Sequence, residues 1–132
     1  RILGHDTIAV VGCSTTPGKA AHGVPAYLQR HGYRVVPVNP FADEILEETT
    51  YDSLAGVPDS IDIGVIDVFR PSEEAGGIVD AAIERAERVG DVSAVWLQLD
   101  ITDAGAGERA AEAGLDFVQD RCLKVEHQRL RG

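Results

Sequence analysis

Five short apolar runs alternate along the chain with longer segments in which apolar residues recur every three or four positions. The runs are apolar at successive positions and rich in β-branched residues, which is typical of strands buried on both faces of a sheet. The predicted strands are Thr7–Val11, Tyr33–Val38, Ile61–Phe69, Ala94–Leu97 and Asp116–Gln119. The segment Asp43–Ser60 has neither period, and we expect it to be irregular with one helical turn at Tyr51–Ala55.

The segments with helical periodicity predict three helices, at Ala20–Arg30, Ser72–Val89 and Asp103–Ala113. Ser72 is a suitable N-cap for the longest of them, and Glu73 and Glu74 suit its positive first turn. At the N-terminus, Ile2 and Leu3 resemble the end of an amphipathic turn that begins upstream.

The alternation of such strands with helices indicates a parallel sheet covered on both faces. We therefore expect an α/β fold, a single doubly wound Rossmann-like domain with a five-stranded parallel sheet. Right-handed crossovers favour the strand order 3-2-1-4-5, numbered along the chain. The 132 residues are enough for one domain with a core and too few for two.

In a doubly wound sheet, ligands bind at the carboxyl ends of the strands. These ends carry the chain's one tryptophan and both of its cysteines. The segments concerned are Gly12-Cys13-Ser14, Asn39-Pro40, Phe69-Arg70-Pro71, Trp96-Leu97-Gln98 and Asp120-Arg121-Cys122. The first of them leads from a strand into a helix, where backbone N–H groups and the helix dipole suit a phosphate group. The sequence thus predicts a ligand site along this rim.

The first of these loops departs from the dinucleotide-binding fingerprint. Gly-x-Gly-x-x-Gly needs a glycine where Ser14 stands, and the second strand should end in an acidic residue that binds a ribose. Here that strand ends in Asn39-Pro40, and Asp43 and Glu44 come too late. Simple NAD binding is therefore disfavoured.

Composition narrows the function further. The net charge of −10 argues against nucleic acid or an anionic membrane as a partner, and no apolar run approaches the roughly 20 residues of a membrane span. Two lysines against ten arginines on an acidic chain indicate a halophilic protein from a high-salt cytoplasm. Two distant cysteines suit a reducing, cytoplasmic compartment. The four histidines lack metal-ligand spacing, so we expect no metal.

Five segments together resemble a known family, the small stand-alone CoA-binding proteins. They are Val10-Val-Gly-Cys-Ser14 with Pro17-Gly-Lys19, Gly32-Tyr-Arg-Val-Val-Pro-Val-Asn-Pro40, Asp67-Val-Phe-Arg-Pro71, Val95-Trp-Leu-Gln98, and Asp120-Arg-Cys-Leu-Lys-Val-Glu126. The family shares its Rossmann-like domain with succinyl-CoA synthetase and the ADP-forming acyl-CoA synthetases. The resemblance implies binding of CoA. It does not imply ligase chemistry, because those enzymes use a phosphorylated histidine on a second domain and an ATP-grasp subunit, which this sequence lacks.

A CoA site at this rim assigns roles to particular residues. We expect Gly12 and the backbone N–H groups of Ser14, Thr15 and Thr16 to hold the pyrophosphate, with charge from Lys19. A solvated loop lysine is the alternative for Lys19.

The adenosine would then be bordered by Asn39 and Pro40, although Asn39 could equally be a turn residue. Val38, which precedes them, is a further candidate for the binding site. Phe69 would pack on the adenine, and Arg70 would stack or meet the 3′-phosphate. Phe69 is just as naturally the end of a core strand.

Four further rim residues are candidates with structural alternatives. Trp96 lies near the rim but also suits a core anchor, and Gln98 needs a polar partner in ligand or loop backbone. Cys13 suits core filling. Cys122 lies between Arg121 and Lys124, whose charges favour a thiolate. This thiolate could form a mixed disulfide with the CoA thiol where an oxidant takes up the two electrons released.

No catalytic set is evident, since His22 has no acid partner and the carboxylates resemble solvated helix faces. We predict a non-catalytic module that binds CoA or acyl-CoA, either as a homo-oligomer or with an acyl-CoA enzyme as partner. One alternative is a nucleotide-dependent oxidoreductase or transferase using NAD(P) or FAD. Another is a structural partner whose core has lost its ligand.

Overall fold

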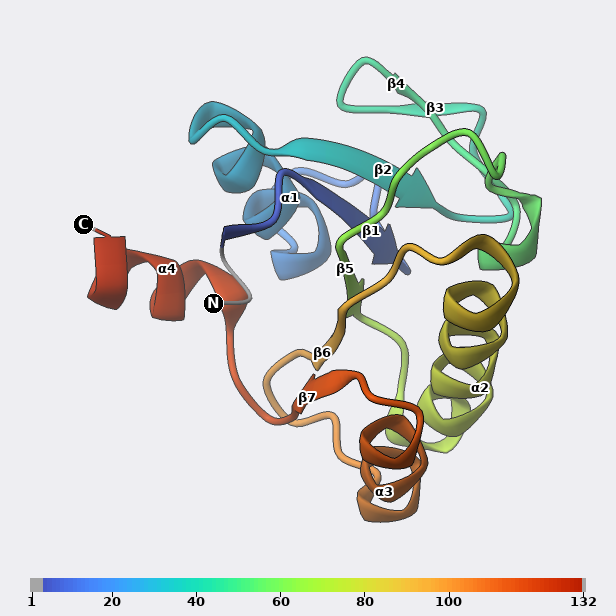
Figure 1. The fold of residues 1–132 in the computed structure, drawn as a ribbon. Coiled ribbons are helices and arrows are strands. Elements are labelled where there is room, and N and C mark those ends of the chain that lie inside the picture. The colour runs from blue at the N-terminus through green and yellow to red at the C-terminus, as the bar shows by residue number, and fades with distance from the viewer. Residues whose placement is uncertain (1–3, 132) are drawn as a thin grey trace.

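The computed structural model describes residues 4–131, with side chains described as far as residue 130. Along the chain, strands and helices alternate as the periodicity predicts (Figure 1). The elements are β1 (Thr7–Val11), α1 (Ala20–Arg30), β2 (Arg34–Val38), β3 (Glu44–Ile45), β4 (Glu48–Thr49), the 3₁₀ turn η2 (Leu54–Gly56), β5 (Val65–Val68), α2 (Ser72–Val89), β6 (Ala94–Leu97), α3 (Ala104–Glu112), β7 (Asp116–Val118) and α4 (Leu123–Arg131). The amphipathic turn predicted at Ile2 and Leu3 lies outside the described residues.

The main sheet has five parallel strands, which confirms the predicted fold class, but its strand order differs from the prediction. The order is β2-β1-β5-β6-β7, or 2-1-3-4-5 in the predicted numbering, instead of 3-2-1-4-5. The third strand pairs with β1 because the outer edge of β2 is already occupied at its carboxyl end. There Tyr51 N–H donates to Pro37 O at 3.1 Å, and Asn39 N–H donates to Tyr51 O at 2.9 Å.

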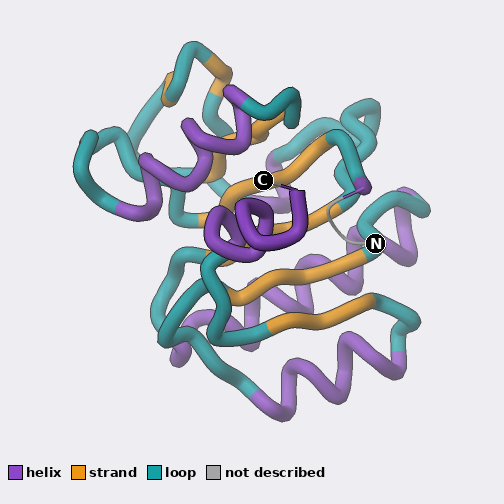
Figure 2. The backbone as a smooth tube through the Cα atoms, turned by 90° about the vertical axis from the view of Figure 1, so that its left-hand side faces the viewer, coloured by secondary structure: helices purple, strands orange, loops and turns teal. Residues whose placement is uncertain are grey.

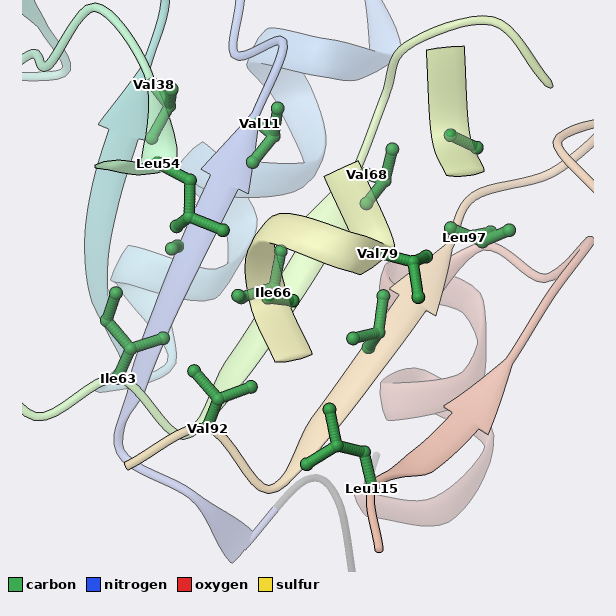
Figure 3. Packing of buried hydrophobic residues seen from close by; sticks show 14 of the residues in the cluster. Val11, Val38, Leu54, Ile63, Ile66, Val68, Val79, Val92, Leu97 and Leu115 are labelled. Atoms are coloured by element: carbon green, nitrogen blue, oxygen red, sulfur yellow. The ribbon is translucent and has the colours of Figure 1, made fainter. Parts of the chain in front are cut away.

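Helices cover both faces of this sheet (Figure 2). Side chains alternate between the two faces of each strand, and the buried ones accordingly form two clusters. One cluster lies under α2 and α3 and includes Ile66, Val68 and Val79, which Figure 3 shows packed together. The other lies under α1 and α4 and includes Leu28 and Leu123. The two covered faces explain why the strands are apolar at successive positions.

The predicted third strand, Ile61–Phe69, is shorter than expected because side chains satisfy its first backbone groups. The guanidinium of Arg85 donates to Ile61 O, the first carbonyl of the predicted strand, at 2.8 Å, and to the preceding carbonyls of Val57 and Pro58 at 2.9 and 3.1 Å. The Asp91 carboxylate accepts from Ile63 N–H at 3.0 Å. These groups need no neighbouring strand, so regular pairing begins only at Val65.

Three other local predictions need adjustment. Pro71, not Ser72, holds the N-cap position of α2, and the Ser72 hydroxyl instead accepts from Thr102 N–H at 3.0 Å. The segment predicted to be irregular contains the β3–β4 hairpin, and its single helical turn is η2. Helix α4 was not predicted.

None of the helices within residues 4–131 is long and apolar enough to cross a membrane.

Candidate functional site

The carboxyl ends of the five parallel strands meet at one edge of the sheet, where the predicted site residues follow them. From β1 the chain passes to β2 on one side, and then returns to β5 on the other side of β1. The topological switch point therefore lies between β1 and β5, and the loops after these strands flank the crevice in which ligands of doubly wound folds bind. The first loop is Gly12–Lys19, and the second begins at Phe69 and Arg70 (Figure 1).

The first loop is shaped by its own backbone and one hydroxyl. Gly12 has a φ of 88°, which glycine adopts without strain, and its N–H donates to Val38 O at 3.0 Å. Ser14 N–H donates to Ala21 O at 2.9 Å, and Ser14 Oγ accepts from Thr16 N–H at 3.0 Å. Of the three backbone N–H groups predicted to hold a phosphate, those of Ser14 and Thr16 are therefore already bonded within the loop. The Ser14 hydroxyl keeps its own hydrogen, so it is able to donate to an oxygen above the loop.

The N-terminus of α1 presents positive charge that the described part of the chain does not neutralise. Its N-cap residue, Lys19, makes no side-chain cap, and the first turn contains no acidic residue. The amides of Ala20 and Ala21 have no intrahelical acceptor at this position. The Lys19 ammonium is exposed and makes no ion pair within residues 4–131.

The other three helices carry a carboxylate at this end. The residues are Glu73 and Glu74 in α2, the N-cap Asp103 of α3, and Glu126 in α4. In α3, the Asp103 carboxylate accepts from Ala106 N–H at 3.0 Å. An anion bound at the start of α1 would supply the charge that these helices take from their own side chains.

Arg70 lies directly over the first loop at the switch point. A Cβ placed on Gly12 would come within 2.9 Å of Arg70 Cδ, so the absence of a side chain at residue 12 makes room for the arginine. The guanidinium donates to Glu74 at 2.7 Å, and both side chains are half exposed. A phosphate near the first loop would therefore compete with Glu74 for Arg70.

Asn39 joins the end of β2 to the first loop. Its Nδ2 donates to Cys13 O at 2.9 Å, and its Oδ1 accepts from Phe41 N–H at 2.7 Å. Asn39 is thus a turn residue that also braces the loop. Pro40, which follows it, is exposed at the rim.

Several predicted site residues lie behind the rim. The side chains of Val38, Cys13, Trp96 and Gln98 are buried, and Phe69 is half-buried against the cluster under α1 and α4. Trp96 Nε1 donates to Arg121 O at 2.8 Å, and Gln98 Oε1 accepts from Leu123 N–H at 3.1 Å. The polar partners of Trp96 and Gln98 are therefore loop and helix backbone. Cys122 is half-buried beside the start of α4.

Sequence reasoning missed a buried carboxyl group below this rim. Asp67 stands inside the apolar β5 between Val10 and Trp96, faces the cluster under α1 and α4, and has no hydrogen-bond partner for either carboxyl oxygen. Burial raises the pKa of Asp67 well above its usual range. Burial and, secondarily, this nearby carboxyl raise the pKa of Cys13 to about 12. The sequence signal that could have identified this group is an acidic residue in the middle of a run of β-branched residues, Val65-Ile66-Asp67-Val68.

We predicted that the carboxylates lie on solvated helix faces, and for two of them this prediction is wrong. Asp67 is fully buried, and Asp91 is buried in an ion pair with Arg85 at 3.0 Å. Arg85 lies on the apolar face of α2, at helical spacing from Val79 and Ala82, which is the signal that could have identified it. Arg85 and Asp91 therefore stabilise the backbone before β5 and do not contribute to the rim.

One cavity of the molecule does not belong to the rim, and the described residues form no metal site. A cavity of about 380 Å³ lies at the amino ends of the strands, and none of the predicted site residues lines it. Within residues 4–131, no three His, Cys, Asp or Glu side chains lie together in a way that could hold a metal ion.

The five-stranded parallel sheet with helices on both faces defines a Rossmann-like domain. Residues 6–128 match the family model described as a CoA binding domain, and the chain belongs to this family.

Relatives cover the chain to different extents. The uncharacterized protein YneT of Bacillus subtilis is 35% identical over 91% of this chain and 84% of its own length. A structure of a hypothetical protein from Pyrococcus horikoshii OT3 has a TM-score of 0.89 and 36% identity, and covers 99% of this chain and 87% of its own. The ADP-forming acetate–CoA ligase II of Archaeoglobus fulgidus is 39% identical over 47% of this chain, but this match is only 10% of the ligase.

Proposed function

We propose that the protein is a non-catalytic module that binds CoA or acyl-CoA, with the pyrophosphate on the loop Gly12–Lys19. The observation that carries this proposal is the start of α1, which lacks both a capping side chain and an acidic residue. The Ser14 hydroxyl, the amide of Thr15, the amides of Ala20 and Ala21, and the Lys19 ammonium would together contact the phosphates. Membership of the CoA binding domain family supports CoA as the source of those phosphates.

The rest of the ligand would lie along the rim on either side of the first loop. In doubly wound folds the adenosine extends toward the end of the second strand, which here is Asn39 and Pro40. Arg70 at the switch point would exchange Glu74 for a phosphate. The pantetheine arm would then run toward the ends of β6 and β7 and toward Cys122. The buried Cys13, Val38, Trp96 and Gln98 would support the loops from below.

The proposal of a binding module without catalysis rests on what the rim side chains contact. His22, in the first turn of α1, has no side-chain hydrogen-bond partner within residues 4–131 that could orient it as a base. The burial of Cys13 keeps it a thiol, because its pKa is raised to about 12.

The experiment that tests this function compares ligands by calorimetry and thermal unfolding in molar KCl. CoA, acetyl-CoA, NAD, NADP and ADP are measured at equal concentration. A ligand at 100 times its Kd adds about 2.7 kcal/mol to the free energy of unfolding, which gives a clear shift in Tm. We expect selective stabilisation by CoA and acetyl-CoA. Stabilisation by NAD or NADP alone, or by none of the five, would refute the proposal.

Lys19 provides a matched pair of variants for locating the site. Lys19→Ala should weaken CoA binding roughly three- to tenfold, as expected for one exposed charge on a phosphate. Arg34→Ala removes an exposed charge at the opposite edge of the sheet and should leave binding unchanged. Equal effects of the two substitutions would indicate general electrostatics instead of a site at Lys19. The difference should grow at low ionic strength.

A further inference from the structure

Phe41 is the one aromatic side chain that this fold leaves in solvent. It is 93% exposed, whereas the other six aromatic residues, all within the described part of the chain, are buried or half-buried. It follows Pro40, which is also exposed, so that the two residues form a small exposed apolar surface at the carboxyl end of β2. Exposed aromatic rings at a ligand-binding edge commonly serve as contact surfaces.

The position of Phe41 is held by the same residue that braces the phosphate loop. Asn39 Oδ1 accepts from Phe41 N–H at 2.7 Å, while Asn39 Nδ2 donates to Cys13 O at 2.9 Å. The backbone of Phe41 is therefore tied through one side chain to the loop Gly12–Lys19. The ring is free while its attachment point is fixed, as a stacking surface requires.

We infer that Phe41 is the stacking surface for the adenine of the bound nucleotide, an inference that rests on the proposed function. The adenosine lies toward the end of β2 in doubly wound folds, and this is where Phe41 stands. A purine offers a flat face that stacks on an exposed aromatic ring. Phe69, the aromatic residue that we first expected to contact adenine, packs against the core and has less surface to offer.

The charges around Phe41 favour a neutral base over a second copy of this chain. Asp43 and Glu44 follow it and are both exposed. A base carries no charge and is not repelled by them. A second copy, with a net charge of −10, would bring like charges together at this edge.

The test measures three ligands against three proteins by calorimetry: wild type, Phe41→Ala and Phe41→Trp. The ligands are CoA, adenosine 3′,5′-bisphosphate, which carries the adenine nucleotide without the pantetheine arm, and 4′-phosphopantetheine, which lacks the adenine. We expect Phe41→Ala to weaken binding of the two adenine ligands by the same factor, about 5- to 160-fold, and to leave binding of 4′-phosphopantetheine unchanged. Phe41→Trp should retain binding, and the fluorescence of the new indole should be quenched by the two adenine ligands.

Leu99→Ala serves as a matched control, and the Tm of each variant shows whether it is folded. Leu99 is 60% exposed at the end of β6, so Leu99→Ala removes an exposed apolar side chain elsewhere on the rim and should leave adenosine 3′,5′-bisphosphate binding unchanged. The Tm of each variant without ligand should match that of wild type, because neither side chain is buried.

Two results would overturn the inference while the proposed function stands. The first is that Phe41→Ala binds CoA with wild-type affinity. The second is that Phe41→Ala weakens binding of 4′-phosphopantetheine by the same factor as binding of the adenine ligands, which would mean that the substitution acts through the loop Gly12–Lys19. A wild-type protein that binds none of the three ligands refutes the proposed function and this inference with it. Self-association that Phe41→Ala abolishes, in a protein without adenine affinity, would assign the ring to a second copy.

Discussion

Replacement of Asp67 by asparagine should change how stability depends on pH, because this carboxyl is buried without a partner. Asp67 lies in the centre of the sheet, between Val10 and Trp96, and is fully buried. Burial disfavours the charged form and raises the pKa of Asp67 well above the ordinary value of 3.8. The native protein therefore retains a proton that the unfolded chain releases once the pH exceeds that value.

The sign and size of the effect follow from proton linkage. Above the unfolded-state pKa the unfolded chain binds fewer protons than the native state, so the free energy of unfolding falls as pH rises. The fall is about 1.4 kcal/mol per pH unit, and it continues until the pH passes the raised pKa of the folded state. Asp67→Asn removes the titrating group from both states and should remove this slope. The free energy difference between variant and wild type should then grow with pH in favour of the variant.

The assay is urea unfolding of both proteins at half-unit steps from about pH 4.5 to 8, at constant salt. Asp52→Asn, which removes the same charge from an exposed position, is the control and should parallel wild type. The readout is the slope, because a buried amide at residue 67 has its own constant cost. A difference between Asp67→Asn and wild type that stays constant across this range would refute the reasoning.

Two further predictions concern other buried groups. Arg85→Ala leaves the Asp91 carboxylate buried without its partner and should lower the free energy of unfolding by about 3–5 kcal/mol in urea titrations. Arg88→Ala, which removes exposed ion pairs from the same helix, should cost less than about 1 kcal/mol, and equal losses would contradict the assignment. At pH 8, a thiol probe should modify Cys122 before Cys13, since Cys13 is buried and its pKa is raised to about 12. Cys122→Ser should remove the fast phase, and a fast phase that persists in that variant would contradict this assignment.

The candidate site could be predicted in part, because its loops follow strands that the pattern already locates. The rim loops after β1, β2 and β5 are where the sequence places them. Which side chains reach solvent could not be predicted. Trp96 and Gln98 point back into the structure, and Phe41, two residues past the predicted Asn39, points out. Exposure depends on what packs against a residue, and the sequence near that residue does not contain this information.

What the sequence by itself determined is the set of local elements. The bounds of Ala20–Arg30, Ser72–Val89 and Ala94–Leu97 agree with the prediction, because burial on one or two faces imposes a period that is visible within a single segment. The class of fold follows from the order of these elements. The first needs only the pattern within each segment, and the second needs only the order of the segments along the chain.

What only the tertiary structure decided is how distant segments meet. The strand order depends on Tyr51 taking the free edge of β2, and the shortened β5 depends on Arg85, which reaches back across about 25 residues to the carbonyl groups before it. Asp67 became an unpartnered buried acid only because helices cover both faces of its strand. Such contacts satisfy backbone and charge across long sequence separations, so packing selects among arrangements that share the same local pattern.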